Sequence, residues 1–372
     1  MTRVVMLVGK ATGGIGVHVR DLAAGLAAAG TEVAIVTDPL TARTFGLGGA
    51  RLLWPDPRRP DPRRLGELRR LLRGADVVHA HGHQAGLVAA FALGPRPRRA
   101  RSRPAFVISL HNEVPLLRRP LRPVIERAER TAMRRADLVT GASADLVAAA
   151  RGLGARHTEL AAVPSPRVAA LLAAGPAERA AARERVTQAH GVAVAHPLIV
   201  TISRIAPQKD LPTLVAASAE VRTRHTWLVA GGGVERLLSQ VRSDVASRGL
   251  PVRFLGPVAA PDDLLLAADL FVLTSTWEAR ALVVQEAMAA GVPVIAADVG
   301  GLPDLLGEGG GVLVPARDPG AFARAIDDLL VDPGLRDRLG QTGRRVAAEW
   351  PDLAATTRWW TLAYDRLIRE IA

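Results

Sequence analysis

Two glutamates in the second half of the chain, Glu278 and Glu286, are separated by seven residues. From Ala281 to Ala290 only Gln285 and Glu286 are polar, so this stretch predicts a largely buried helix. A carboxylate inside such a helix needs partners, because burying it alone costs several kcal/mol. Vicinal sugar hydroxyls would be suitable partners, and a structural ion pair is the alternative.

Two cations bracket a predicted helix start in the same half. Arg204 and Lys209 follow a predicted strand, and a helix is expected from about Leu211. Cations beside the free amides of a helix N-terminus form a site for a diphosphate. The arginine can donate bidentate hydrogen bonds to the phosphate oxygens, and the lysine acts as a point charge. The alternative is a solvated turn with two surface cations.

The first half has a glycine-rich segment after its first predicted strand, from Gly9 to Gly16, with Gly13, Gly14 and Gly16 leading into a helix. Glycines there allow a backbone to approach a phosphate. The spacing differs from the dinucleotide fingerprint, so a turn that only joins strand to helix would look the same.

Alternating histidines end another predicted strand of the first half. His79, His81 and His83 would share one face of an extended segment and could bind zinc, although no fourth ligand is evident. The alternative is that they line the floor of a crevice, and no metal site is expected.

Short apolar runs alternate with helical patterns along the whole chain, which is typical of α/β domains with parallel sheets. We expect two doubly wound, Rossmann-like domains facing one crevice, with ligands at the carboxyl ends of the strands. The first covers residues 1–168 and the second 169–352, joined within 163–197, and the helix 353–372 packs back on the first. The predicted strands are 4–8, 32–37, 76–80, 106–110, 137–141, 198–203, 226–231, 252–255, 270–274, 292–296 and 311–314.

Composition excludes several classes of protein. The 372 residues contain no cysteine, which removes disulfides, thiolate metal sites and cysteine nucleophiles. No apolar run is long enough to span a bilayer, and nothing resembles a secretory signal, so we expect a cytoplasmic protein. An aromatic fraction of 3% argues against nucleic acid as a partner.

Positive charge is concentrated in the first half. Residues 1–175 hold 27 basic and 13 acidic side chains. This asymmetry fits contact with an anionic acceptor or with the inner membrane face, and a solvated arginine-rich surface is the alternative. The segment 63–73 predicts a basic amphipathic helix that either lies on a membrane or packs on the sheet. Residues 94–104 predict a mobile loop.

These residues, in this order, resemble the retaining glycosyltransferases of family 4, which have the GT-B fold. The most specific segment runs from Glu278 through Glu286 to Val294. Arginine in place of lysine is typical of a GC-rich, actinobacterium-like genome. The resemblance spans nearly the whole chain and includes these further segments: Gly13-Gly14, His79-Ala80-His81, Ser109-Leu110-His111, Arg204 with Lys209, Gly231–Gly233, 254–258 and Gly300–Asp304.

The resemblance implies transfer of a hexose-type sugar from a nucleoside diphosphate, UDP or GDP, to an acceptor hydroxyl on a small molecule or lipid. Transfer would retain configuration, need neither metal nor cofactor, and use phosphate stabilisation as a main catalytic term. His111, Glu278, Arg204 and Lys209 would be catalytic. Implied donor-binding residues are Gly13, Gly14, Gly16, Arg204, Lys209, Gly231, Val258, Glu278, Ala279, Arg280, Ala281, Leu282 and Glu286.

Carried over residue by residue, Glu286 would hold the ribose, Glu278 the sugar, and Arg204 with Lys209 the diphosphate. The backbone near Val258 would meet the base, Gly14 would let the first domain close on the phosphates, and His111 would lie near the anomeric carbon. These roles follow from the resemblance and not from spacing.

Three positions depart from the family pattern. Arg280-Ala281 replaces a common Phe-Gly and places a charge near the sugar or acceptor, Pro164-Ser165-Pro166 replaces Pro-Asn-Gly, and Asp304 replaces glutamate. The acceptor, sugar, base and oligomeric state remain open. Alternatives are a nucleotide-sugar epimerase on the same fold, or a non-catalytic basic protein that binds membrane or nucleic acid.

Overall fold

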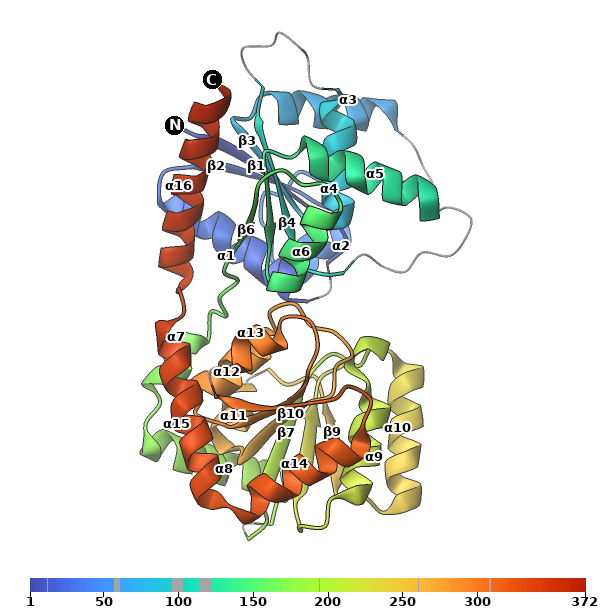
Figure 1. Ribbon diagram of the computed structural model, residues 1–372, viewed down its shortest axis with the longest axis vertical. Helices are drawn as coiled ribbons and strands as arrows, with labels where there is room; N and C mark the ends of the chain where they lie inside the picture. Colours follow the sequence, from blue (N-terminus) through green and yellow to red (C-terminus); the bar gives the residue numbers. More distant parts are fainter. Residues whose placement is uncertain are drawn as a thin grey trace. The chain divides into compact units, whose positions relative to one another are not determined.

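A computed structural model describes residues 1–11, 13–56, 61–95, 103–113, 122–193, 195–259, 261–307 and 309–372. It divides into two compact units, unit 1 with Met1–Pro164 and Pro351–Ala372, and unit 2 with Ser165–Trp350 (Figure 1). The expected boundary at 168 falls four residues inside unit 2, because Ser165 and Arg167 bond to Glu286 there. Residues 96–102 of the predicted loop 94–104 lie outside the described residues.

Unit 1 is a parallel sheet of six strands in the order β2-β1-β3-β4-β5-β6, with helices on both faces. Its strands are β1 (Arg3–Val8), β2 (Glu32–Val36), β3 (Val77–His81), β4 (Ala105–Leu110), β5 (Leu138–Gly141) and β6 (Thr158–Leu160). Its helices are α1 (Gly14–Ala28), α2 (Pro39–Thr44), α3 (Pro62–Arg73), α4 (His83–Leu93), α5 (Arg122–Arg135), α6 (Ala144–Gly152) and α16 (Leu353–Ile371).

Unit 2 repeats this plan with the strand order β12-β11-β10-β7-β8-β9, again all parallel. Its strands are β7 (Leu198–Ile202), β8 (Thr226–Ala230), β9 (Val252–Gly256), β10 (Leu270–Leu273), β11 (Val294–Ala297) and β12 (Gly311–Val314). Its helices are α7 (Val168–Ala173), α8 (Pro176–His190), η1 (Pro207–Lys209), α9 (Leu211–Glu220), α10 (Glu235–Arg248), α11 (Pro261–Ala267), α12 (Leu282–Ala289), α13 (Leu302–Leu306), α14 (Pro319–Val331) and α15 (Pro333–Glu349).

The α/β architecture with two doubly wound sheets is confirmed, and each predicted strand overlaps an observed one. Residues on both faces of the central strands are buried, as in Val4 to Leu7, because helices cover both faces of a parallel sheet. The prediction missed β6, a polar edge strand of three residues that exists by pairing with β5. The segment 163–197, predicted to join the two domains, contains α7 and α8, which pack on α12 and α11 within unit 2.

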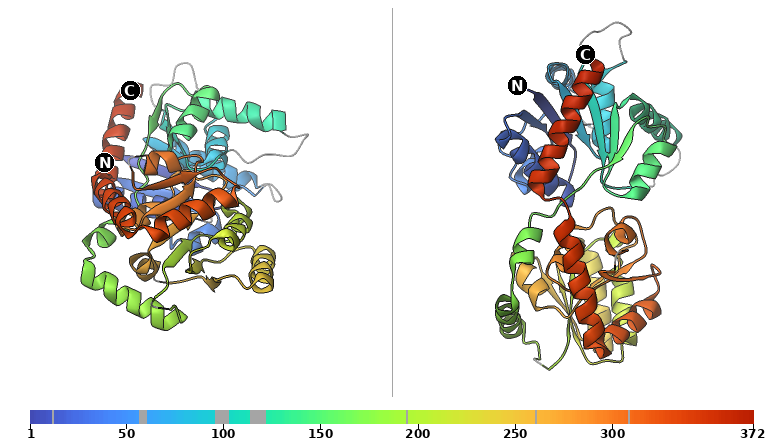
Figure 2. Two further views of the ribbon diagram at one scale, coloured as in Figure 1. Left: turned by 60° about the horizontal axis from the view of Figure 1, so that its bottom comes forward. Right: turned by 60° about the vertical axis from the view of Figure 1, so that its left-hand side comes forward.

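Helix α16 closes the face of the first sheet that carries α1 (Figure 2). Trp360 and Tyr364 are each 1% exposed and lie in one core with Met6 and Val107. A Cβ on Gly25 of α1 would approach Thr357 of α16 to 2.4 Å, so a residue without a side chain lets the helices lie close. The C-terminal segment is therefore part of the unit 1 core.

The basic helix α3 packs on unit 1 through its leucines. Leu68 and Leu72 are fully buried, whereas Arg63, Arg64, Arg70 and Arg73 are exposed. Packing on the fold thus explains the apolar stripe, and the arginines face solvent. Among the described residues, every helix falls short of the length and apolarity that crossing a bilayer requires.

The packing of α16 predicts a large difference between two substitutions on that helix. Trp360→Ala should lower the free energy of unfolding of unit 1 by about 3 to 5 kcal/mol, because it empties a buried site. Leu362→Ala, at a side chain 69% exposed, should change it by less than about 0.5 kcal/mol. Urea unfolding followed by circular dichroism measures both, and equal effects would contradict the role of α16 in the core.

Candidate functional site

The order of strands reverses between β7 and β10 in unit 2. The chain proceeds from β7 outward to β8 and β9, then returns to the other side of β7 and proceeds through β10 to β12. Ligands of open parallel sheets bind at the carboxyl ends of the strands where this reversal occurs, because the following loops diverge there. The segment with Arg204 and Lys209 follows β7, and the segment with Glu278 follows β10.

Lys209 and Glu278 meet at this point. The Lys209 ammonium donates to Glu278 Oε1, and the two side chains are only 12% and 10% exposed. The loops that carry them are tied together through their backbones, since the Gln208 carbonyl accepts from Thr276 N at 2.8 Å. A cation and a carboxylate are therefore held side by side where the chain leaves β7 and β10.

Further bonds fix the backbone on either side of this pair. The Thr274 hydroxyl donates to the carbonyl of Lys209 at 3.0 Å. The Glu278 carbonyl accepts from Gly301 N at 2.8 Å, and a Cβ on Gly300, at φ 55°, would lie 2.0 Å from that carbonyl oxygen. Only glycine fits that approach, which explains the Gly300-Gly301 turn.

Arg204 lies on an exposed turn that is joined to the glycine turn after β8. Ile205 N donates to Gly232 O at 2.9 Å, and Val234 N donates to Ile205 O at 2.8 Å. Gly231 has φ 139°, and a Cβ there would lie 1.8 Å from the Ser203 carbonyl oxygen. The turn at Gly231 thus positions the backbone that carries Arg204.

The residues between Glu278 and Glu286 lead into α12. Ala279 and Ala281 are buried, and Leu282 begins the helix. The Arg280 guanidinium lies 5.4 Å from the centre of the Trp350 ring, and burial lowers its pKa, opposed by Asp304. Half-buried Val258, which follows β9, packs against the core of unit 2.

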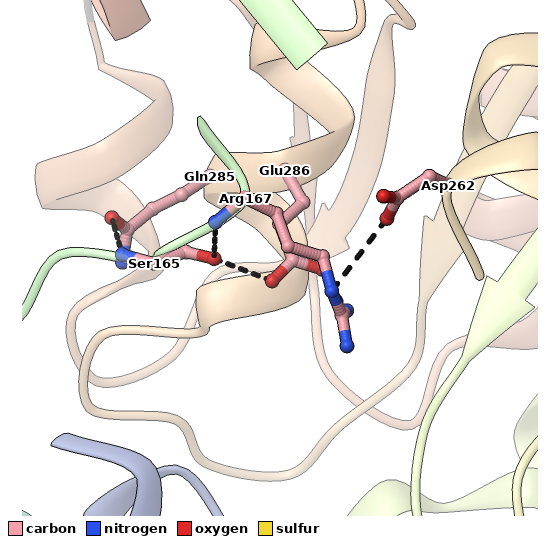
Figure 3. Close-up of polar contacts among 5 residues, drawn as sticks. All are labelled: Ser165, Arg167, Asp262, Gln285 and Glu286. Carbon is pink, nitrogen blue, oxygen red and sulfur yellow. Dashed lines mark hydrogen bonds and ion pairs between the residues drawn. The ribbon is translucent and has the colours of Figure 1, made fainter. Parts of the chain in front are cut away.

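Glu286 is 5% exposed in α12 and bonds to the start of unit 2. Ser165 Oγ donates to its Oε1 at 2.5 Å, and Arg167 Nη1 donates to its Oε2 at 3.2 Å. Figure 3 shows Arg167 lying between Glu286 and Asp262, whose Oδ1 is 3.6 Å from Arg167 Nε. Neighbouring Gln285 accepts from Ser165 N at 3.3 Å.

Burial dominates the electrostatics of Glu286. It raises the pKa of this carboxyl above its ordinary value, while Ser165 and Arg167 pull it down and Asp262 adds to the rise. The ion pair that the sequence left as an alternative is therefore present. A carboxylate has about four acceptor positions, and among the described residues Ser165 and Arg167 use two of those on Glu286, so the group has capacity for vicinal hydroxyls.

In unit 1 the strand order reverses between β1 and β3. Gly13 caps α1, and Gly14 and Gly16 form its first turn. A Cβ on Gly16 would approach the Phe45 ring to 2.4 Å, so this glycine has a packing role. The loop after β1 thus reaches the helix N-terminus that the sequence predicted, and Thr12 lies outside the described residues.

Histidines gather beside this loop. His81 Nδ1 lies 3.2 Å from His111 Nε2, and His18 of α1 lies against both rings. Burial lowers the pKa of His18 to about 4, opposed by Asp21, and that of His111 to about 3, with His18 adding to the shift. Burial also holds the pKa of His81 well below its ordinary value, so the three rings are neutral at pH 7.

The alternating set His79, His81 and His83 does not converge. His79 Nδ1 lies 2.7 Å from the Tyr364 hydroxyl and its Nε2 2.7 Å from Ser109 Oγ. His83 Nε2 lies 3.1 Å from the Asn112 carbonyl. His81 alone of the set joins His18 and His111.

Sequence reasoning missed three residues of these clusters. Ser165 and Arg167 lie about 120 positions before Glu286, and the departure at Pro164-Ser165-Pro166 was the available signal. His18 follows the glycine-rich loop on α1, where its helical position next to that loop was the only hint.

Two family models match the chain in succession. The model for "Glycosyl transferase 4-like domain" matches residues 13–166, and the model for "Glycosyl transferases group 1" matches residues 182–346. The first lies in unit 1 apart from its last two residues, and the second lies in unit 2.

Curated relatives match part of the chain. A D-inositol 3-phosphate glycosyltransferase of Salinispora arenicola is 37% identical over 169 residues, which are 41% of this chain and 38% of the relative. A GDP-mannose-dependent monoacylated alpha-(1-6)-phosphatidylinositol monomannoside mannosyltransferase of Corynebacterium glutamicum is 32% identical over 191 residues, 48% of each chain. The matches thus span less than half the length of these relatives.

Solved structures match nearly the whole fold. HepE of Anabaena, solved in complex with UDP, superposes with a TM-score of 0.82 at 20% identity, covering 98% of this chain and all of that one. Sucrose-phosphate synthase of Thermosynechococcus elongatus gives a TM-score of 0.80 at 23% identity, with full coverage of both chains. At this identity the likeness establishes the fold.

The contact at Gly231 predicts a substitution with a large cost. Gly231→Ala should destabilise unit 2 by roughly 3 kcal/mol or more, because the new methyl group would overlap the Ser203 carbonyl. Gly249→Ala is the matched control, since φ is 60° there and nothing lies within 4 Å, so it should cost only about 1 to 2 kcal/mol. Denaturant unfolding measures both variants. Equal losses of stability would show that the positive φ alone sets the cost and that the contact with the Ser203 carbonyl adds nothing.

Proposed function

The chain belongs to the family 4 glycosyltransferases with the GT-B fold, and on this premise we propose that it transfers a sugar from a nucleoside diphosphate to an acceptor hydroxyl. The observation that carries the proposal is the Lys209 and Glu278 pair at the strand reversal of unit 2. Such a pair offers a cation for a diphosphate and a carboxylate for sugar hydroxyls at one place.

In the proposed reaction the bond between the anomeric carbon and the diphosphate breaks as the acceptor oxygen forms its bond to that carbon. The acceptor proton passes to the leaving phosphate, and the configuration is retained. Arg204, Lys209 and the N-terminus of α9 would stabilise the charge that develops on the diphosphate, so this step needs no metal.

The remaining donor contacts follow the family pattern. Glu286 would accept from the two ribose hydroxyls, while hydrogen bonds from Ser165 and Arg167 favour its ionised form and orient it. Glu278 would bind sugar hydroxyls, and the backbone at Val258 would meet the base. Gly14 and His111 of unit 1 would face the phosphates and the anomeric carbon.

The donor is a UDP- or GDP-sugar in this proposal. The HepE structure contains UDP, and the corynebacterial relative is named for GDP-mannose. The names of two curated relatives contain D-inositol 3-phosphate and a phosphatidylinositol monomannoside, which supports an acceptor that bears phosphate or is linked to lipid. The arginine-rich surface of unit 1 has the charge to attract it.

Thermal unfolding with UDP, GDP, ADP and TDP tests the proposal. One nucleotide should raise the unfolding temperature selectively, since a ligand at about a hundred times its Kd adds about 2.7 kcal/mol of stability. Glu286→Gln should weaken the binding of that nucleotide about tenfold, because the ribose hydroxyls lose a charged hydrogen-bond acceptor.

The matched control is Glu349→Gln at an exposed position of α15, which should bind as the parent does. A parent chain that no nucleotide stabilises would remove the basis for a sugar-nucleotide enzyme. Unchanged affinity in Glu286→Gln would remove the ribose assignment alone.

We propose further that unit 1 contacts anionic membranes peripherally through α3. Its exposed arginines Arg63, Arg64 and Arg70 lie on one helix whose apolar face is buried in the fold, so attraction would be electrostatic. Each arginine near such a surface contributes about 1 kcal/mol at physiological ionic strength.

Sedimentation with phosphatidylglycerol vesicles measures this contact. Changing Arg63, Arg64 and Arg70 together to Gln should weaken binding at least about tenfold. The same change at three exposed arginines of α10, Arg236, Arg242 and Arg248, is the control and should have little effect. Equal losses in both variants, or equal binding to phosphatidylcholine vesicles, would contradict a contact through α3.

A further inference from the structure

Unit 2 contains a cavity of about 640 Å³ whose lining residues take no part in the proposed transfer. The turn between α7 and α8, the turn after α12 and one face of α15 form its wall, and α7, α12 and α15 contact one another (Figure 1). The turn after α12 leads into the amino end of β11, whereas Lys209 and Glu278 follow the carboxyl ends of β7 and β10. Because the sheet is parallel, the cavity lies near the edge opposite to that pair.

Glycines allow the elements around this cavity to approach each other. A Cβ on Gly340 of α15 would lie 2.3 Å from the Gly291 carbonyl oxygen, so α15 can lie against the turn only at a residue without a side chain. Gly291 itself has φ 71°, a backbone conformation that favours glycine. The volume of the cavity falls within the range of about 300 to 1,000 Å³ that is typical of sites for small molecules.

Two half-buried arginines line the cavity, Arg179 of α8 and Arg344 of α15. Arg344 holds the ends of α7 and α12 together, because its guanidinium donates to four backbone carbonyls there. These are the carbonyls of Leu171, Leu172, Ala174 and Ala289. Arg344 therefore has a structural role, and it brings a positive charge to the wall of the cavity.

Arg179 keeps most of its hydrogen-bonding capacity. Among the described residues its only hydrogen bond runs from Nη1 to the Ala290 carbonyl, whereas a guanidinium has five N–H donors. Neither Arg179 nor Arg344 forms an ion pair with a carboxylate in the described part of the chain.

The two guanidinium groups are close enough to influence each other. Burial and the neighbouring charge of Arg344 lower the pKa of Arg179, while Asp269 and Asp337 oppose this shift. Of the side chains that line the cavity, two are cationic and one, the exposed Asp337, is anionic. An anion between the two arginines would relieve their repulsion and occupy the unused donors of Arg179.

We propose that Arg179 and Arg344 bind the phosphate group of a small phosphorylated organic molecule, a phosphomonoester. A phosphomonoester carries nearly two negative charges at pH 7, which matches two guanidinium groups, and arginine donates bidentate hydrogen bonds to phosphate oxygens. A cavity of this volume has room for an organic part as well as the phosphate. The site goes beyond the proposed transfer, which uses neither arginine.

Calorimetric titration of the full chain with glucose 1-phosphate tests the site, with inorganic phosphate and glucose as comparisons. One molecule of glucose 1-phosphate should bind per chain, inorganic phosphate should bind more weakly, and glucose should not bind. Arg179→Gln should weaken glucose 1-phosphate at least about tenfold, because a charged bidentate donor is lost. Arg345→Gln removes the same charge from an exposed position of α15 and should bind as the parent does.

A variant with the opposite effect guards against loss of the fold. Asp337→Asn removes the acidic side chain from the cavity and should strengthen glucose 1-phosphate roughly threefold. A parent chain that binds neither phosphate compound would overturn the proposal, as would a folded Arg179→Gln with parental affinity.

Phosphate bound at the proposed diphosphate site would give a different pattern. Binding that is lost in Arg204→Gln and kept in Arg179→Gln would place the ligand there and overturn the proposal. Equal affinity for inorganic phosphate and glucose 1-phosphate would overturn the assignment of an organic ligand. The nucleotide panel reads the donor site, so the two proposals can fail separately.

Discussion

Reversal of strand order in a parallel sheet is the constraint on which the rest of the structure depends. In each unit the chain builds the sheet outward from one central strand and then returns to its other side, so the loops after two neighbouring strands diverge. Helices that cross over from these strands cannot cover that point. The polar side chains of Lys209 and Glu278 lie at such a point in unit 2, and that of His81 lies at one in unit 1. These side chains are largely buried, but in the described part of the chain no crossover helix covers them.

Burial of these polar groups is possible only because each finds a partner. Lys209 and Glu278 neutralise each other, and Glu286 is compensated by Ser165 and Arg167. Removing one partner would leave a charge in a site of low polarity, which costs far more than the pair contributes. Ser165 and Arg167 accordingly belong to unit 2, together with the glutamate that they compensate.

The two units solve the problem of polar burial differently. Unit 2 buries charged groups in pairs, as a site for a charged diphosphate would require. Unit 1 buries rings that remain uncharged because desolvation lowers their pKa values, and it keeps its surplus of arginine on the surface, as in α3. The surplus positive charge of unit 1 therefore lies on its surface and not on its buried histidines.

The sequence by itself determined the α/β class and the two sheets. It also determined that Arg204, Lys209 and Glu278 follow strands and that Glu286 lies in a buried helix. These are local properties, because apolar runs buried on both faces predict parallel strands, and the residues after each run must lie at one edge of the sheet. Tertiary structure alone decided that Ser165 and Arg167 satisfy Glu286, that His18 joins His81 and His111, and that β6 exists. Such contacts join residues far apart in the chain, and they depend on strand order and helix placement, which spacing along the sequence does not encode.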